Sequence, residues 1–343
     1  MGFRTATMEN SLKILVTGNL GYVGSHLTEL LIASGHEVIG CDLSIFPKAV
    51  CGELSKPSLQ LIKDFRSLTS PELIGVEAIA HLAGISNDPM GELNPGLTTL
   101  INGKGTIHLA KVAQEAGVRI FAFASSCSIY GSAGDQPRTE NDPTKPLSEY
   151  AQSKLYAEEG LAKLATQNFH VYLLRNATAY GSSSVLRTDL VVNDLSVGML
   201  INGIAEIKSD GSPWRPLIHC LDMARAFKEF IEKDPEIASG VPINIGFNEE
   251  NFQVRDVANL VKTVWVNGEC RFGNSEFRDS RNYKVCFDRL KSIFPEFKPI
   301  FPLREGIWNL RDYLLQIDYS ENDYSSGRFI RIVELKQNIY KIS

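Results

Sequence analysis

The segment Lys13-Ile-Leu-Val-Thr-Gly-Asn-Leu-Gly-Tyr-Val-Gly24 joins an apolar strand directly to the start of an amphipathic helix. Its three glycines, Gly18, Gly21 and Gly24, recur at three-residue spacing at this junction. Glycines placed in this way permit a tight turn, bring the backbone close to a pyrophosphate and leave the helix N-terminus free to face its negative charge. The segment therefore predicts a dinucleotide-binding strand–turn–helix unit.

Further strand and helix patterns alternate along the chain after this segment. The strand patterns lie at 13–17, 37–41, 77–82, 119–125 and 170–175, and the helical patterns lie at 22–34, 93–116 and 149–167. Such alternation is typical of a parallel sheet that carries helices on both faces. We expect an α/β fold, a Rossmann-type doubly wound parallel sheet with a smaller C-terminal substrate-binding lobe.

The pattern becomes less regular after residue 180, where the second unit is expected to begin. Clusters of Gly, Ser and Pro are followed by amphipathic helical patterns, and the tail reads as a linker and a short docking helix. We expect three parts: a dinucleotide-binding domain at 11–180, a substrate-binding lobe at 181–315 with some chain crossing back to the sheet, and a C-terminal extension at 316–343.

The composition is that of an ordinary globular protein. The 343 residues are 43% hydrophobic and 22% charged, with a formal net charge of -5, so nothing favours a nucleic acid or an anionic membrane as partner. The six cysteines are scattered without a C-x-x-C spacing, which favours reduced thiols and a cytoplasmic location. No metal site and no membrane span are predicted, and any bound phosphate must be held by local groups.

An acidic residue follows the second strand pattern, where it can contact a bound dinucleotide. Asp42 lies eighteen residues beyond Gly24, at the position from which a carboxylate accepts hydrogen bonds from the adenosine ribose. A carboxylate there repels a 2′-phosphate, so NAD is expected rather than NADP. Asp64 and Phe65 lie further along the chain and are expected at the edge of the adenine.

Three residues at and after the strand pattern at 119–125 form a candidate catalytic group. Ser126 ends the strand, and Tyr150 and Lys154 lie one turn apart on the helix that follows. An ammonium near a phenol lowers the pKa of the phenol, so Lys154 is expected to make Tyr150 a usable base. Ser126 can hold the same substrate oxygen while a nicotinamide accepts hydride from the carbon.

Taken together, these motifs resemble those of the extended short-chain dehydrogenases, the NAD-dependent sugar epimerase/dehydratase family. They follow the family's order over roughly residues 13 to 312. The matching motifs are Thr17-Gly-Asn-Leu-Gly-Tyr-Val-Gly24, Asp42, Asp64-Phe-Arg66, His81-Leu-Ala-Gly84, Asn102, Ser125-Ser-Cys-Ser-Ile-Tyr-Gly131, Tyr150 with Lys154, and Gly211-Ser-Pro-Trp-Arg-Pro-Leu-Ile-His219.

The resemblance implies roles for individual residues. It implies catalysis by Ser126, Tyr150 and Lys154. The residues implied to bind NAD are Gly18, Gly21, Tyr22, Val23, Gly24, Asp42, Asp64, Phe65, Leu82, Ala83, Gly84, Ser125, Tyr150 and Lys154. Those implied to bind a nucleotide-diphosphate sugar are Ser126, Thr178, Asn193, Arg215 and Arg281. Asn102 is implied to support the active site, and the helices at 93–116 and 149–167 are implied to pair into a homodimer.

The positions at which this chain differs from the family pattern reduce the number of reactions expected for it. Sugar 4,6-dehydratases carry an Asp-Glu pair after the catalytic Thr or Ser, where this chain has Cys127 and Ser128. We interpret Cys127 as a small packing residue rather than an acid or base. Thr178 stands where the family commonly has Asn. The segments Arg187-Thr-Asp-Leu-Val-Val-Asn-Asp194 and Asp279-Ser-Arg-Asn-Tyr283 resemble a branch in which some members oxidise a nucleotide-linked heptose at C4 and stop there.

The expected function is NAD-dependent oxidation at C4 of a nucleotide-activated sugar, by a 4-epimerase or a C4 oxidoreductase. A nucleotide-sugar 4,6-dehydratase or 4-ketoreductase is the alternative within the same class. A non-catalytic NAD(H)-sensing regulatory protein is the alternative of another class. The intact Ser126, Tyr150 and Lys154 argue against a sensor, because a sensor has no use for them.

Overall fold

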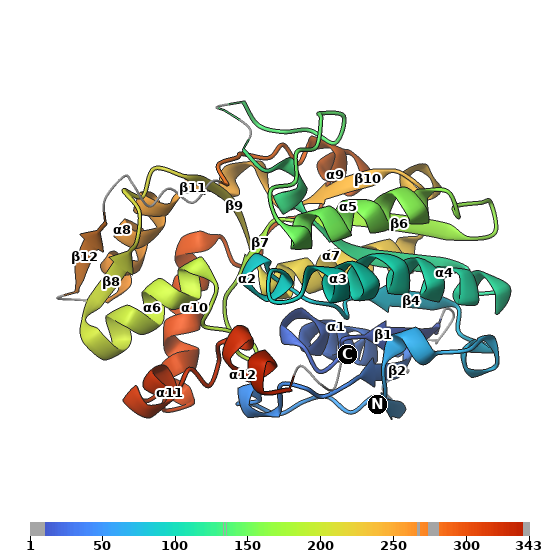
Figure 1. Ribbon diagram of the computed structural model, residues 1–343, viewed down its shortest axis with the longest axis horizontal. Coiled ribbons are helices and arrows are strands. Elements are labelled where there is room, and N and C mark those ends of the chain that lie inside the picture. Colours follow the sequence, from blue (N-terminus) through green and yellow to red (C-terminus); the bar gives the residue numbers. More distant parts are fainter. Residues whose placement is uncertain (1–10, 133, 135, 266–267, 274–280, 339–343) are drawn as a thin grey trace, which may run out of the picture.

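Seven parallel strands form the central sheet of the protein (Figure 1). The structure, a computed structural model, describes residues 11–132, 134, 136–265, 268–273 and 281–338. Along the sheet the strands follow the order β3-β2-β1-β4-β5-β6-β10. Their bounds are β1 Lys13–Thr17, β2 Glu37–Asp42, β3 Leu59–Ile62, β4 Ala78–His81, β5 Ile120–Ser126, β6 His170–Asn176 and β10 Pro242–Ile245.

The strand order reverses direction between β1 and β4, and this switch point locates the binding crevice. In open parallel sheets, ligands bind beyond the carboxyl ends of the strands at such a point. Here β1, with β2 on one side and β4 on the other, presents the Gly-rich turn at that edge. The predicted Rossmann-type doubly wound fold is confirmed.

Helices cover both faces of this sheet, which explains its nearly continuous apolar strands. Ile14 and Val16 point to one face and pack in a core with α1 and α7, while Leu15 points to the other and packs with α4 and α5. The helices of this unit are α1 Tyr22–Ala33, α2 Asp88–Gly91, α3 Pro95–Thr98, α4 Thr106–Glu115, α5 Glu149–Ala162, α7 Cys220–Lys233 and α9 Asp288–Ile293. Thus α7, α9 and β10, although they follow residue 181, belong to the large unit.

The smaller lobe lies to the left of the central sheet in Figure 1 and has its own apolar core. A three-stranded sheet, β11-β9-β7, connects it to the large unit, and β12 pairs with β8. Its elements are β7 Thr178–Tyr180, α6 Val191–Asn202, β8 Ile204–Ile207, β9 Trp214–His219, β11 Asn251–Gln253, α8 Val254–Val264, β12 Glu269–Phe272 and α10 Leu303–Gln316. None of the helices within the described residues is long and apolar enough to cross a membrane.

Two predicted elements differ in the structure. The single helix expected at 93–116 is three pieces, because the π-helical segment η4 (Thr99–Gly105) separates α3 from α4. In this π-helical segment the buried side chain of Asn102 forms two hydrogen bonds with the backbone of Ile85. The helix expected at 149–167 ends at Ala162, before a turn that leads into β6.

The C-terminal extension is helical throughout most of its described length. The segment interpreted as a linker contains α11 (Glu321–Ser326), which Ser320 and Asp323 cap and which Gly327 ends in a left-handed conformation. A second helix, α12 (Arg331–Asn338), follows it and reaches the large unit. The linker prediction was therefore wrong, because local capping outweighs the polar composition of this stretch.

A buried ion pair joins α5 to the central sheet. Glu158 of α5 and Arg175 of β6 are 4% and 5% exposed, and the Arg175 Nη2 to Glu158 Oε2 distance is 2.8 Å. Arg175 also donates from Nη1 to the Tyr130 hydroxyl at 2.9 Å, and Ser125 donates to Glu158. Because Tyr150 and Lys154 stand on the same helix, this pair holds the candidate catalytic helix at a fixed distance from β5 and β6.

We predict that Arg175→Met lowers the free energy of unfolding by about 3–5 kcal/mol, because it leaves the Glu158 charge buried without a partner. The double variant Glu158→Gln, Arg175→Met is expected to lose less stability than Arg175→Met alone, since neither side chain is then charged. Urea unfolding of the three proteins measures both values. A double variant no more stable than the single one would contradict this interpretation of the pair.

Candidate active site

A cleft of about 1020 Å³ opens at the carboxyl edge of the sheet, between the large unit and the smaller lobe. It collects residues from the loops after β1 and β4, from α1, β2, β5 and α5, and from the smaller lobe. The predicted site residues that line it are Gly18, Gly21, Tyr22, Val23, Gly24, Asp42, Asp64, Phe65, Leu82, Ala83, Gly84, Ser125, Ser126, Tyr150, Lys154, Thr178, Arg215 and Arg281. Residues distant in sequence thus meet around one space.

The Gly-rich turn has the close packing that a bound pyrophosphate needs. Gly18 has a φ of +76°, and a Cβ there would lie 2.7 Å from the backbone nitrogen of Ala83. A Cβ on Gly24 would lie 2.0 Å from the Gly18 carbonyl oxygen. Gly21 caps α1 without a side-chain hydrogen bond, so no side chain blocks the helix N-terminus. These features fit the diphosphate of a dinucleotide at the start of α1.

Asp42 lies at the end of β2, on the wall of the cleft. Its carboxylate accepts hydrogen bonds from the backbone nitrogens of Leu20, at 3.3 Å, and Ser44, at 2.8 Å. Burial raises the pKa of Asp42, and these backbone hydrogen bonds oppose the shift. Asp64 lines the cleft further along, where it accepts a 2.6 Å hydrogen bond from Arg66 Nη2. Both acids stand where the ribose and adenine of NAD are expected.

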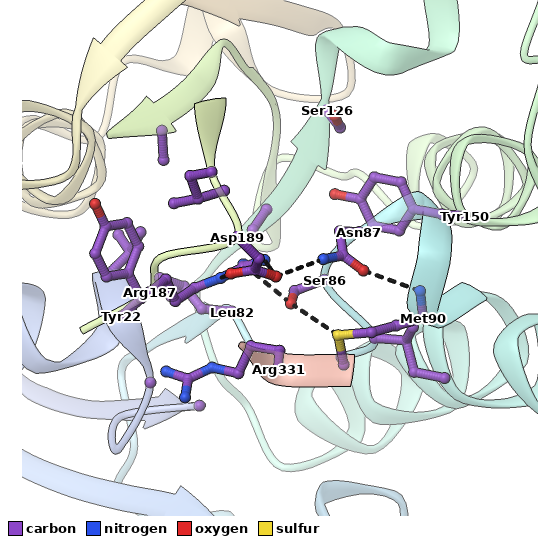
Figure 2. A pocket seen from close by; sticks show the side chains of 18 of the residues that line it. Tyr22, Leu82, Ser86, Asn87, Met90, Ser126, Tyr150, Arg187, Asp189 and Arg331 are labelled. Carbon is purple, nitrogen blue, oxygen red and sulfur yellow. Dashed lines mark hydrogen bonds and ion pairs between the residues drawn. The ribbon is translucent and has the colours of Figure 1, made fainter. Parts of the chain in front are cut away.

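Ser126, Tyr150 and Lys154 meet at the inner end of the cleft. Ser148 caps α5 by accepting a 3.2 Å hydrogen bond from the Ala151 nitrogen, which fixes the first turn that carries Tyr150. Lys154 Nζ donates to the Ala124 carbonyl at 2.8 Å and lies 5.8 Å from the centroid of the Tyr150 ring. Figure 2 shows the Tyr150 hydroxyl directed into the cavity, with Ser126 on the same wall.

The electrostatics of this group differ from the prediction. Burial raises the pKa of Tyr150 to about 12, and a hydrogen bond with Ser126 opposes the rise. Burial also lowers the pKa of Lys154 to about 8, against the attraction of Glu158. The expected lowering of the phenol pKa by Lys154 is not seen in the protein alone, because burial has the largest effect on the pKa of Tyr150.

Two arginines and a threonine line the cleft on the side of the smaller lobe. Arg215 donates from Nη1 to the carbonyls of Trp214, at 2.7 Å, and Arg281, at 2.5 Å. Arg281 forms an ion pair with Asp88. Thr178 faces the same space from β7. Both arginines line the cleft, where guanidiniums can contact a diphosphate.

Asn193 was predicted to contact substrate, but the structure places it behind the wall of the cleft. Its side chain is fully buried, and its Oδ1 accepts a 2.9 Å hydrogen bond from the Gly181 nitrogen. Its Nδ2 donates to the Tyr22 hydroxyl and to the carbonyls of Gly181 and Arg187. The substrate prediction for Asn193 is corrected, because these bonds occupy its amide in joining the smaller lobe to α1.

Asn102 and Cys127 support the cleft from behind. Asn102 accepts a 2.8 Å hydrogen bond from the Ile85 nitrogen, and its Nδ2 donates to the Ile85 carbonyl and to Ser153 of α5. Cys127 is 1% exposed, its thiol donates to the Arg175 carbonyl, and burial raises its pKa. These surroundings suit a packing residue rather than an acid or base.

Comparison with known proteins identifies the family. Residues 14–246, more than half of the chain, match the NAD dependent epimerase/dehydratase family. The chain belongs to this family. It is an enzyme, and its cofactor is NAD, as the Gly-rich turn and Asp42 indicate.

Similar proteins cover most of the chain. A putative UDP-glucose 4-epimerase of Methanocaldococcus jannaschii is 28% identical over 86% of this chain and 95% of its own length. UDP-glucuronic acid decarboxylase 1 of Danio rerio is 26% identical over 86% of this chain and 71% of its own length. The solved structure of MoeE5 in complex with UDP-glucose and NAD has a TM-score of 0.75 and 26% identity, and covers 89% of this chain and 99% of MoeE5.

In this epimerase/dehydratase chain, the structure adds a polar network to the predicted site (Figure 2). Arg187 donates from Nη2 to Asp189 at 2.8 Å and from Nη1 to Ser86 at 3.2 Å. Asn87 donates to the same carboxylate of Asp189 at 2.9 Å. The resemblance of segment 187–194 to one branch of the family was the available signal for Arg187 and Asp189. The other such segment, 279–283, lies partly outside the described residues.

We predict that Asp42→Asn weakens the preference for NAD over NADP by about tenfold, because it removes the charge that repels a 2′-phosphate. Titration of the cofactor-free protein with each dinucleotide, followed by fluorescence, measures the preference. Glu37→Gln, at the exposed start of the same strand, is the control and should leave the preference for NAD over NADP unchanged. Wild-type protein that binds NADP as tightly as NAD would refute this role for Asp42.

Proposed function

We propose that this enzyme oxidises the C4 hydroxyl of a nucleotide-activated sugar, as a 4-epimerase or a C4 oxidoreductase. The observation that carries the proposal is the meeting of Ser126, Tyr150 and Lys154 at the inner end of a cleft whose outer parts suit NAD and a diphosphate. This arrangement combines a proton acceptor, a hydrogen-bond partner for the same oxygen and a cation.

Oxidation requires that the sugar hydroxyl loses its proton while the carbon loses hydride. Tyr150 accepts the proton from the C4 hydroxyl, and Ser126 holds the same oxygen by a hydrogen bond. When bound, NAD would supply the hydride acceptor, and the positive charge of its nicotinamide would favour the phenolate form of Tyr150. Lys154 is held by the Ala124 carbonyl beside the Tyr150 ring, where its ammonium can bind a ribose hydroxyl of the cofactor and stabilise the phenolate.

Arg215 and Arg281 support a nucleotide diphosphate as the part of the substrate that is recognised. Both line the smaller-lobe side of the cleft, and guanidiniums bind phosphate oxygens through paired hydrogen bonds. MoeE5, which is similar over 89% of this chain, has been solved with UDP-glucose and with UDP-glucuronic acid. We infer a nucleotide-diphosphate sugar as substrate.

The surroundings of Ser126 favour this reaction over dehydration. Removal of water requires an acid and a base beyond Tyr150. The two following residues are Cys127, whose thiol bonds the Arg175 carbonyl inside the core, and Ser128, and neither supplies a carboxyl group. A 4-ketoreductase would use the same three residues in reverse. An NAD(H) sensor would need none of them to face the cleft.

We predict that Tyr150→Phe lowers the rate of hydride transfer by about 1000-fold or more and leaves NAD bound, because the ring still packs while the base is gone. Ser126→Ala removes one hydrogen bond and should lower the rate of hydride transfer by a smaller factor, about 10- to 100-fold. Reduction of bound NAD, followed by absorbance with a panel of nucleotide-diphosphate sugars, measures both rates. Near wild-type reduction by Tyr150→Phe would overturn the proposed function.

The control is Tyr156→Phe, which removes a hydroxyl from an exposed position on the same helix and should leave the rate unchanged. Mass spectrometry of the products separates the possible outcomes. A 4-epimer with NAD regenerated indicates an epimerase, and a released 4-keto sugar with NADH left behind indicates an oxidoreductase. Absence of turnover with every sugar nucleotide, together with tight NAD binding, would favour a sensor.

We also propose a homodimer and a reducing, cytoplasmic location. Leu100 of η4 and Tyr156 of α5 are 43% and 45% exposed, although both are large and apolar. Tyr156 lies against Gly103, where a Cβ would come within 2.7 Å of its ring, so the two helical segments present one surface. A second copy would cover this surface by pairing the same segments. All six cysteines are free thiols, which suits a reducing compartment.

We predict that Leu100→Glu combined with Tyr156→Glu gives a monomer, because burying two carboxylates in the interface is unfavourable. Light scattering at micromolar concentration measures the mass of the variant and of the wild-type dimer. Ile237→Glu, at an 85% exposed position elsewhere, is the control and should remain dimeric. A wild-type protein that is monomeric under these conditions would contradict the proposed assembly.

A further inference from the structure

Arg331, at the start of α12, is a buried cation on the wall of the cleft. Its side chain lines the cleft with those of Ile332 and Leu335, and the residue is 3% exposed. The guanidinium lies over the Phe46 ring, 4.6 Å from its centroid, and Nη2 donates to the Val185 carbonyl at 3.4 Å. Among the described residues it forms no ion pair, which is unusual for a buried arginine.

The helix that carries Arg331 bridges the two rims of the cleft. On one rim, Glu334 accepts a 3.5 Å hydrogen bond from the Lys48 nitrogen, and Asn338 donates to the Ile45 carbonyl at 3.3 Å. On the other rim, α12 contacts α2. Because the loop after β2 and the helix α2 stand on opposite sides of the switch point, α12 lies across the entrance between them.

The charges that face Arg331 leave its positive charge incompletely balanced. Burial lowers the pKa of Arg331 to about 10, and the neighbouring Arg187 lowers it further, while Asp189, Glu334 and Asp42 oppose the shift. Asp189 is already paired with Arg187 at 2.8 Å. None of the three carboxylates lies within ion-pair distance of Arg331 in the described part of the chain. An anion bound in the cleft would therefore gain a strong partner here.

The direction of the Arg331 side chain indicates which anion in the cleft it would bind. In Figure 2 the Arg331 guanidinium extends toward the Tyr22 side of the cavity and away from Tyr150. Tyr22 is the first residue of α1, so this is the side on which the Gly-rich turn receives a pyrophosphate. The turn at residues 18–24 contains no basic residue of its own.

We propose that Arg331 binds the pyrophosphate of NAD and that α12 is a strap that closes over the bound cofactor. The proposal rests on the placement of NAD in this cleft. It follows that α12 must move before NAD can exchange, so the cofactor is retained through purification. The C-terminal extension thereby acquires a role in cofactor binding.

The test compares Arg331→Met, Arg331→Lys and Lys336→Met after removal of bound cofactor. Lys336 is an exposed residue of the same helix, so its variant controls for loss of a charge on α12. Titrations with NAD, ADP-ribose and adenosine separate the parts of the cofactor. We expect Arg331→Met to bind NAD and ADP-ribose about 10- to 100-fold more weakly, and adenosine as wild type does. Arg331→Lys should lose less than Arg331→Met, and Lys336→Met should match wild type.

Several outcomes would overturn the proposal. Unchanged NAD affinity in Arg331→Met, alone or with a raised KM for the sugar nucleotide, would show that Arg331 does not bind the cofactor. An equal loss of adenosine affinity, or equal losses in the Lys and Met variants, would show that only the packing of α12 matters. Wild-type protein that fails to bind NAD would instead refute the proposed function, so the two failures are distinguishable.

Discussion

The contact between the Gly-rich turn and the strand beside it is the constraint on which the site depends. A side chain at Gly18 would meet the backbone of Ala83, and one at Gly24 would meet the Gly18 carbonyl. Because both approaches are possible only for glycine, β1, β4 and the start of α1 can pack tightly at the switch point of the sheet. The cleft begins at this junction, and the residues on its walls are arranged around it.

The helix α5 positions the catalytic side chains relative to this junction. One side of it carries Tyr150 and Lys154 into the cleft, and a further turn carries Glu158 to the buried ion pair with Arg175. The opposite side exposes Tyr156 against Gly103 of η4. The helix α5 therefore contributes to the active site, to the core and to the proposed dimer surface. Because all three depend on its position, a buried ion pair that fixes this helix is useful beside the active site.

The distribution of charge shows how an acidic protein can bind an anionic cofactor and substrate. The net charge is -5, so the chain as a whole does not attract phosphates. The cleft nevertheless contains Arg187, Arg281 and Arg331, of which Arg187 and Arg281 form ion pairs with acids of the site itself. Pairing with these acids orients the two guanidiniums without giving the surface a positive field.

The sequence by itself determined the features that depend on neighbours along the chain. The spacing of Gly18, Gly21 and Gly24 predicted the turn, alternation predicted the parallel sheet, and a four-residue separation placed Tyr150 and Lys154 on one face of a helix. Asp42 was predictable because parallel strands end at one edge of the sheet, so the residue that ends β2 must approach the turn after β1.

The tertiary structure alone decided which polar groups face the cleft and how burial changes them. Asn193 has the chemistry of a substrate contact, but the fold uses its amide inside the protein. Tyr150 has a cation beside it, yet burial raises its pKa. The tail meets the loop after β2 across 286 residues of sequence, where α12 brings Arg331 into the cleft. Burial and long-range docking arise from the packing of the whole chain, and no local pattern of residues encodes them.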